Sequence, residues 1–166
     1  MQNRYNYFFD NSTSTYTFAT KNGFLYRVVF IIDETFSTIS GEEIPYVFQI
    51  VIDKTTDELE PYDAKVSKTI EAIVERFFCK VENSLIYVCS GDNTKAKQRH
   101  QIFDRWYKKS EYQDIVMKID NIITIATNNK NIQKLYTSFM FHKNNPVYEK
   151  LMTIYGRIEE VLSKDI

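Results

Sequence analysis

The sequence has few of the residues on which disulfide-rich or loop-dominated proteins depend. Its 166 residues include two cysteines, four glycines and three prolines. Two cysteines are too few for a disulfide framework, and so little glycine and proline argues against a disordered chain. Cys79 and Cys89 both lie in apolar contexts, so we expect two buried free thiols in a reducing compartment.

Motifs that signal metal, nucleotide or catalytic sites are also missing. No CxxC or HExxH pattern occurs, and no glycine-rich phosphate-binding loop of the GxGxxG or GxxxxGK[ST] type. The stretch from Asp33 to Glu60 holds eight acids and one base, but they lie in predicted loops without EF-hand spacing. We therefore predict no metal site and no cofactor, and assign no catalytic residue.

Long apolar runs are absent, and composition points to one domain. Nothing approaches the roughly 20 apolar residues of a membrane span, and the first ten residues lack the apolar core of a secretory signal. With 43% hydrophobic residues, twelve Tyr and twelve Phe, the chain can bury a core built on large rings. We expect a single α+β domain over residues 1–166, cytoplasmic and without a membrane partner.

Apolar and alternating runs predict about six strands. Asn22-Gly23, between the first two runs, is typical of a tight type I′ turn with positive φ at both positions. The second run is apolar almost throughout, which predicts a strand that is central or packed on both faces. The fifth is either a hairpin or, as we favour, one bent strand. The predicted strands are 16–20, 24–32, 46–52, 85–89, 115–126 and 135–142.

Three helices are predicted from apolar spacing and capping residues. The first follows Asp63 and runs to about Lys80, the second spans Thr94–Lys109, and the third starts at Asn145-Pro146 and runs toward the C-terminus. Residues 33–43 are expected to form a loop. The predicted fold is a mainly antiparallel, twisted sheet with these helices packed on it, in the order β-β-β-α-β-α-β-β-α.

The stretch from Leu85 to Lys109 organises the chain. It reads as a central strand, a polar turn at Ser90–Thr94 and a basic helix that carries the only tryptophan. Between Thr94 and Lys109 there are six bases and one acid, although the net charge of the whole chain is −1. Such a helix is usually a solvated face with extended lysines. As candidate binding residues we select Asp92, Lys97, Arg99, His100, Arg105 and Trp106.

Several functions are compatible with this helix. An exposed row of Lys97, Gln101, Arg105 and Lys108 suits an acidic protein partner, or less readily nucleic acid, with Tyr107 and Tyr112 stacking on bases. Asp92 and Arg99 could instead form a structural pair. The second hypothesis is a small enzyme that binds a phosphate-bearing substrate at the Ser90–Thr94 turn. It would use Arg99, His100 and Asp92, with His142 or another titratable group close by.

A spaced pattern of aromatic, apolar and polar residues runs through much of the chain. Its segments are Tyr16-x-Phe18-x-Thr20-x-x-Gly23-x-x-Tyr26, Thr69-Ile70, Phe77-Phe78, Ile86-Tyr-Val-Cys89-x-x-Asp92 and Arg99-x-x-x-Phe103-x-x-Trp106. In this pattern the chain resembles a family of small uncharacterised proteins from the Bacteroidetes group of bacteria, over residues 16–107 with a looser match at 142–146. The resemblance implies a bacterial cytoplasmic protein and no particular chemistry. Ser90 stands where the family often has an acid, which argues against a paired-carboxylate site.

The leading hypothesis is therefore a non-enzymatic, intracellular binding domain that works through the basic helix face. It depends on that helix staying exposed and on its cations not being neutralised by the chain's own acids.

Overall fold

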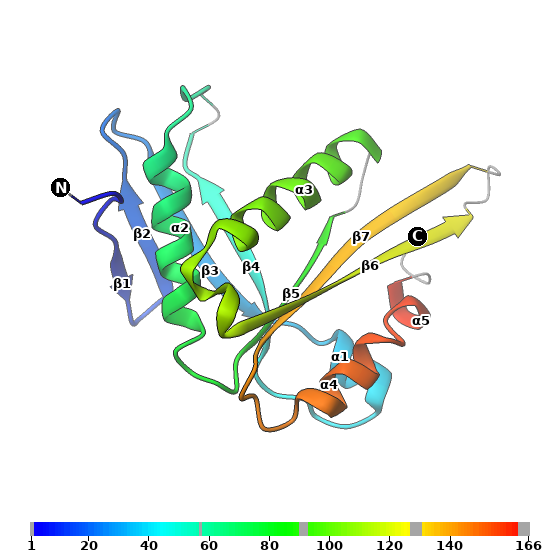
Figure 1. Ribbon diagram of the computed structural model, residues 1–166. Helices are drawn as coiled ribbons and strands as arrows, with labels where there is room; N and C mark the ends of the chain where they lie inside the picture. The colour runs from blue at the N-terminus through cyan, green and yellow to red at the C-terminus, as the bar shows by residue number, and fades with distance from the viewer. Residues whose placement is uncertain (1, 57, 90–92, 127–130, 163–166) are drawn as a thin grey trace.

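The computed structural model describes residues 2–56, 58–89, 93–126 and 131–162 (Figure 1). In these residues one seven-stranded sheet runs in the order β1-β2-β3-β4-β5-β7-β6. All neighbouring strands pair antiparallel except β4 and β5, which are parallel. The strands are β1 Phe8–Asp10, β2 Thr15–Ala19, β3 Leu25–Ile32, β4 Val47–Lys54, β5 Ser84–Cys89, β6 Val116–Ala126 and β7 Ile132–His142.

Helices cover both faces of the sheet, so the fold is mixed α and β as predicted (Figure 1). On one face α2 (Ala64–Phe77) and α3 (Asn93–Lys109) contribute to the first apolar cluster. On the other, α1 (Thr35–Ser40), α4 (Tyr148–Tyr155) and α5 (Glu159–Leu162) surround the second. A 3-10 turn, η1 (Glu111–Asp114), joins α3 to β6.

One strand and one helix of the structure were not predicted from the sequence. The three residues of β1 add a seventh strand beyond the six expected. Residues 33–43, predicted as a loop, contain α1. Phe36 is fully buried there, and the Asp33 carboxylate accepts a hydrogen bond from the Thr35 N–H at 2.9 Å. Helical periodicity has little room to show in six residues, so the pattern alone did not reveal α1.

The two long predicted helices on the first face are confirmed, and the C-terminal one is shorter than expected. Asp63 caps α2 by accepting a hydrogen bond from the Lys65 N–H at 3.0 Å, but α2 ends at Phe77 rather than near Lys80. The C-terminal helix begins at Tyr148, not Pro146. The buried Asn145 accepts a hydrogen bond from the Val147 N–H at 2.9 Å, and its amide donates to Ser84 Oγ at 3.2 Å. It is then interrupted between α4 and α5.

The hairpin between β2 and β3 forms, but not through the predicted type I′ turn. Gly23 has a φ of +81°, while Asn22 is not among the positive-φ residues. The Gly23 N–H bonds Thr20 O at 3.0 Å, and the Thr20 N–H bonds Phe24 O at 2.9 Å. This is a three-residue loop, a β-turn followed by a left-handed glycine, which is the next most common hairpin connection.

Replacing Gly23 by alanine is expected to destabilise the protein by about 1 kcal/mol, because a Cβ disfavours the left-handed region. No atom lies within 4 Å of the added Cβ, so backbone strain is the whole cost. Gly23→Asn should cost less, since asparagine tolerates this conformation. Urea unfolding of both variants tests this, and equal costs for Ala and Asn would contradict it.

β3 is central, which is the first of the two alternatives predicted, and it is packed mainly on one face. The side chains of Tyr26, Val28 and Phe30 join the first apolar cluster. On the opposite face Leu25 is 41% and Ile31 is 52% exposed, because α1, α4 and α5 cluster over the other part of the sheet. The prediction for residues 85–89 was correct, since β5 lies between two strands and is buried almost throughout.

The sheet parts between β4 and β5. Their register consists of Val47 with Ser84 and Phe48 with Leu85, after which the strands diverge (Figure 1). The remaining length of β4 therefore pairs only with β3, and the remaining length of β5 only with β7. α2 precedes β5 and α3 follows it, so the two helices cross the first face on either side of this parting.

Candidate functional site

A cleft of about 680 Å³ lies between α2, α3 and the segment that leads into α2. Val66 of α2 and Ile102 and Trp106 of α3 supply apolar lining. Leu59 and Tyr62 line the opposite side and are 96% and 92% exposed. A volume of this size is typical of sites that take a drug-sized ligand or a few side chains of a partner. We call this space, with its lining, the α2–α3 cleft.

The cations of the cleft are not equivalent. Lys68 forms an ion pair with Glu71 at 3.1 Å, and the ammonium of Lys54 donates to the Glu58 carbonyl. Arg105 and Lys109 lie four residues apart on the same side of α3 and are exposed. Within the described residues, neither of these two forms an ion pair with the chain's own acids.

Two carboxylates fix the segment opposite α3. The Tyr26 hydroxyl donates to Glu60 Oε2 at 2.6 Å, and the Tyr5 hydroxyl donates to Asp63 Oδ2 at 2.5 Å. Burial and the bond to Glu60 raise the pKa of Tyr26, while the bond from Tyr5 lowers the pKa of Asp63. Both carboxylates thus act as anchors of the cleft wall.

A polar network lies between α3 and strands β6 and β7. The sequence did not predict this network. The side chain of Lys118 is 2% exposed and its ammonium contacts Asp104 Oδ1 at 3.1 Å and the carboxylate of Asp120. Asp104 also pairs with Lys108 at 2.8 Å, and Ser138 Oγ donates to Asp120 at 2.5 Å. Burial raises the pKa of Asp104, but hydrogen bonds from both lysines outweigh it and hold that pKa below its ordinary value.

His100 borders this network. Its Nε2 lies 3.9 Å from Asp120 Oδ2, and its ring lies 5.3 Å from that of Tyr136. Nδ1 is buried and has no hydrogen-bond partner among the described residues. Burial lowers the pKa of His100 below its ordinary 6.5, and the charge of Asp120 opposes that shift. The neutral imidazole is therefore the favoured form near neutral pH.

The selected binding residues divide into two groups. Lys97, Arg99 and Arg105 are exposed on α3, and half-buried Trp106 lines the cleft beside Arg105. His100 faces the network instead. Asp92 and residues 90–92 of the Ser90–Thr94 turn lie outside the described residues. The helix keeps an exposed side in its described part, and among the cations of the proposed exposed row Lys108 pairs with an acid, Asp104.

His142, which was proposed to assist an enzymatic site, lies far from Cys89 at the end of β5. His142 pairs with Val116 at the start of β6, whereas Cys89 pairs with Tyr136. Tyr136 and His142 are six positions apart in the sequence, a distance of about 20 Å along β7. His142 is buried, and its Nδ1 accepts a hydrogen bond from the Asn144 N–H at 3.0 Å. The hypothesis that His142 serves a substrate at this turn is wrong.

The cysteine prediction is half correct. Cys89 is buried as expected, and burial raises the pKa of its thiol. Cys79 is exposed, contrary to expectation, because α2 ends two residues before it and the chain turns toward β5. Both thiols are free.

The two tyrosines proposed to stack on bases are unsuited to that role. Tyr112 is 5% exposed and belongs to the first apolar cluster. The Tyr107 hydroxyl donates to the Val116 carbonyl at 2.6 Å, which ties the end of α3 to β6. These rings therefore hold the fold together and leave nucleic acid without its proposed aromatic contacts.

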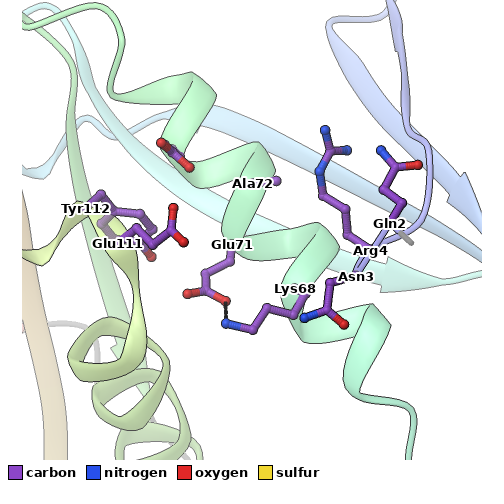
Figure 2. Close-up of a pocket in the computed structure, with 9 residues that line it drawn as sticks. Gln2, Asn3, Arg4, Lys68, Glu71, Ala72, Glu111 and Tyr112 are labelled. Carbon is purple, nitrogen blue, oxygen red and sulfur yellow. Dashed lines mark ion pairs between the residues drawn. The ribbon is translucent and has the colours of Figure 1, made fainter.

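A second hollow, of about 250 Å³, lies on the other side of α2. In Figure 2 the N-terminal segment with Arg4 and the η1 segment with Glu111 flank the Lys68–Glu71 ion pair. Three glutamates line it against two cations, so it is acidic, unlike the α3 side of the cleft. It contains none of the residues selected from the sequence.

The described ranges contain neither a cluster of metal ligands nor a helix that could span a membrane. No group of three or more His, Cys, Asp and Glu side chains in these ranges could hold a metal ion. Likewise, none of the helices in the described part of the chain combines the length and apolar character needed to span a bilayer.

Residues 62–157 match the family of unknown function DUF6169, which is more than half of the chain, and the protein belongs to this family. The resemblance noted in the sequence to a family without an assigned activity is thereby confirmed. The sequence has no match among curated proteins. A solved structure of a CoA-dependent acyl-homoserine lactone synthase, MesI, is similar at 9% identity with a TM-score of 0.38, over 88% of this chain and 71% of that one.

Proposed function

We propose that this protein is a non-enzymatic binding domain whose working surface is the α2–α3 cleft, together with the basic side of α3. The partner we propose is an acidic protein segment that carries a large apolar side chain. The observation behind this is the combination of exposed Leu59 and Tyr62 with Arg105 and Lys109, which no acid of the described residues neutralises. The two free thiols suit an intracellular setting.

The chemistry of the cleft favours a partner with both properties. Large apolar side chains that are more than 90% exposed beside a concave site become favourable contacts when a partner covers them. Arg105 adjoins Trp106, and arginine and tryptophan are the residues most enriched where binding energy concentrates. Uncompensated cations next to this apolar surface orient an acidic partner and speed its encounter.

The proposal predicts that Arg105→Glu with Lys109→Glu abolishes capture of the partner. A tagged wild-type protein and this double variant are compared by pull-down from the native cell lysate, with protein and nucleic acid both analysed. The retained species should be a protein, lost at least tenfold in the variant, because two cations become two anions at the centre of the site.

A matched control reverses two exposed lysines that lie outside both the cleft and α3, Lys80→Glu and Lys143→Glu, so that the net charge changes equally. This control should retain the partner. A third variant, Leu59→Ser with Tyr62→Ser, alters side chains whose exposure makes folding insensitive to them, and it should also weaken capture. Equal loss in the lysine control, or nucleic acid as the retained species, would overturn the proposal.

A further inference from the structure

The docking of α3 on the sheet depends on one ionisable residue at its centre. Along the side that faces the sheet, Ala96 is fully buried, and Phe103 and Trp106 pack on the first apolar cluster. Between them the side chain of His100, which is 12% exposed, points at the network of Lys118 and Asp120. A histidine among apolar contacts makes the helix sensitive to its protonation.

Charged and titratable groups from every element packed here surround His100. α3 contributes Asp104 with its partner Lys108, and β6 contributes Lys118 and Asp120. Tyr87 of β5 lies 6.2 Å and Tyr136 of β7 lies 5.3 Å away between ring centroids. Two ammonium groups and two carboxylates balance while the imidazole is neutral, so a proton on His100 adds a charge that the network does not compensate.

The hydrogen-bonding geometry around His100 also disfavours its protonation. An imidazolium donates from both nitrogens and needs an acceptor at each. Nε2 is 3.9 Å from Asp120 Oδ2, too far for a hydrogen bond, and the other oxygen of that carboxylate, Oδ1, is held by Lys118 and Ser138. Nδ1 has no acceptor among the described residues. A buried N–H donor and a buried charge would both be left unsatisfied.

We infer that His100 is a pH-responsive latch: the neutral imidazole allows α3 to dock on β5, β6 and β7, and its protonation loosens that docking. Since the folded protein holds the pKa of His100 below 6.5, released or unfolded forms bind the proton more readily. The docked state is therefore fully stable above pH 6.5 and loses stability as pH falls through the interval between 6.5 and the lowered pKa.

The latch acts on the α2–α3 cleft through the helix itself. Phe103, which stacks on Tyr87 at 4.5 Å, and Trp106 follow His100 at three and six residues on the same side. Six helical residues span about 9 Å, so a shift of α3 at His100 moves Trp106. The inference stands without the proposed binding partner, because it concerns the free protein.

The chain has so few tryptophan and histidine residues that fluorescence and NMR signals can be assigned to single side chains. The sequence has one tryptophan, on α3, and two histidines, of which one is His100. Emission of Trp106 is followed while pH is lowered from about 8 to about 5, and the two histidine Cε1–H signals are titrated by NMR on the same samples. Both the emission change and the His100 signal should show a common midpoint below 6.5.

His100→Gln should abolish the emission change, whereas the control His142→Asn, which keeps an acceptor for the Asn144 N–H, should retain it. Asp120→Asn should move the midpoint to lower pH, because it removes the charge that favours the imidazolium. A His100 midpoint at or above 6.5 in the wild type would overturn the inference, as would an emission change that survives His100→Gln. The NMR titration decides the matter even if a variant fails to fold.

Discussion

Lys118→Ala is expected to destabilise the protein by about 2–3 kcal/mol. The ammonium of Lys118, almost completely buried, holds Asp104 and Asp120 together beneath α3. Removing one member of a buried ion pair typically costs about 3–5 kcal/mol, because the remaining charge is left without compensation. Asp104 and Asp120 are 28% and 40% exposed, and Lys108 stays beside Asp104, so solvent and this second cation reduce the cost. Urea unfolding followed by circular dichroism measures it.

The control for Lys118→Ala is the double variant Lys118→Ala with Asp120→Asn. The asparagine amide keeps the shape of the aspartate side chain, and its oxygen can accept from Ser138 without the stranded charge. The double variant should therefore be more stable than Lys118→Ala alone, and the cycle should give a coupling energy of about 1 kcal/mol or more. Strictly additive effects would show that the two residues do not act as a pair.

Phe139→Ala should cost about 3–5 kcal/mol, the usual range for a buried phenylalanine. Phe139 is 0% exposed at the middle of β7, which lies between β5 and β6. Its ring lies 5.1 Å from that of Phe36 and 5.4 Å from that of Tyr155, so it joins α1 and α4 to the sheet. Truncation would leave a cavity among rigid rings that cannot collapse to fill it.

Thermal and urea unfolding of Phe139→Ala measures the loss, and Phe8→Ala is the control. Phe8 is 72% exposed on β1, so removing the same atoms there should change stability by no more than about 0.5 kcal/mol. A Phe139 variant that lost no more stability than the Phe8 variant would mean that the second apolar cluster does not hold α1 and α4.

Much of the fold was predictable because local patterns and tertiary packing agree. The side chains of α2 and the stretch 85–89 have clear periodicity and chemical boundaries, and both elements formed where expected. Failures occurred where tertiary contacts outweighed the local signal. Asn145 was expected to cap a helix. Its Oδ1 does accept a hydrogen bond from the Val147 N–H at 2.9 Å, but its amide bonds Ser84, far away in sequence, and the regular helix starts only at Tyr148.

The candidate site was predictable only in part. Arg105 and Trp106 could be predicted because they belong to a helix with many basic residues. Leu59 and Tyr62, which line the opposite side of the cleft, lie more than 40 residues earlier in a segment without periodicity, so they could not be predicted. The sequence contains one indication of the network around Lys118. A lysine and an aspartate lie two residues apart within an apolar strand, and this spacing places both side chains on one face of the strand. Its partner Asp104 comes from α3, and no sequence pattern relates the two.

The short register between β4 and β5 limits the cohesion of the sheet. Two residue pairs join these strands, compared with seven between β3 and β4 and six between β5 and β7. Along this seam backbone hydrogen bonds contribute little cohesion, and the contacts of α2 across the first apolar cluster must supply it. The four-stranded and three-stranded parts of the sheet are thus two potential cooperative units, and amide hydrogen exchange can proceed from the seam in each without global unfolding.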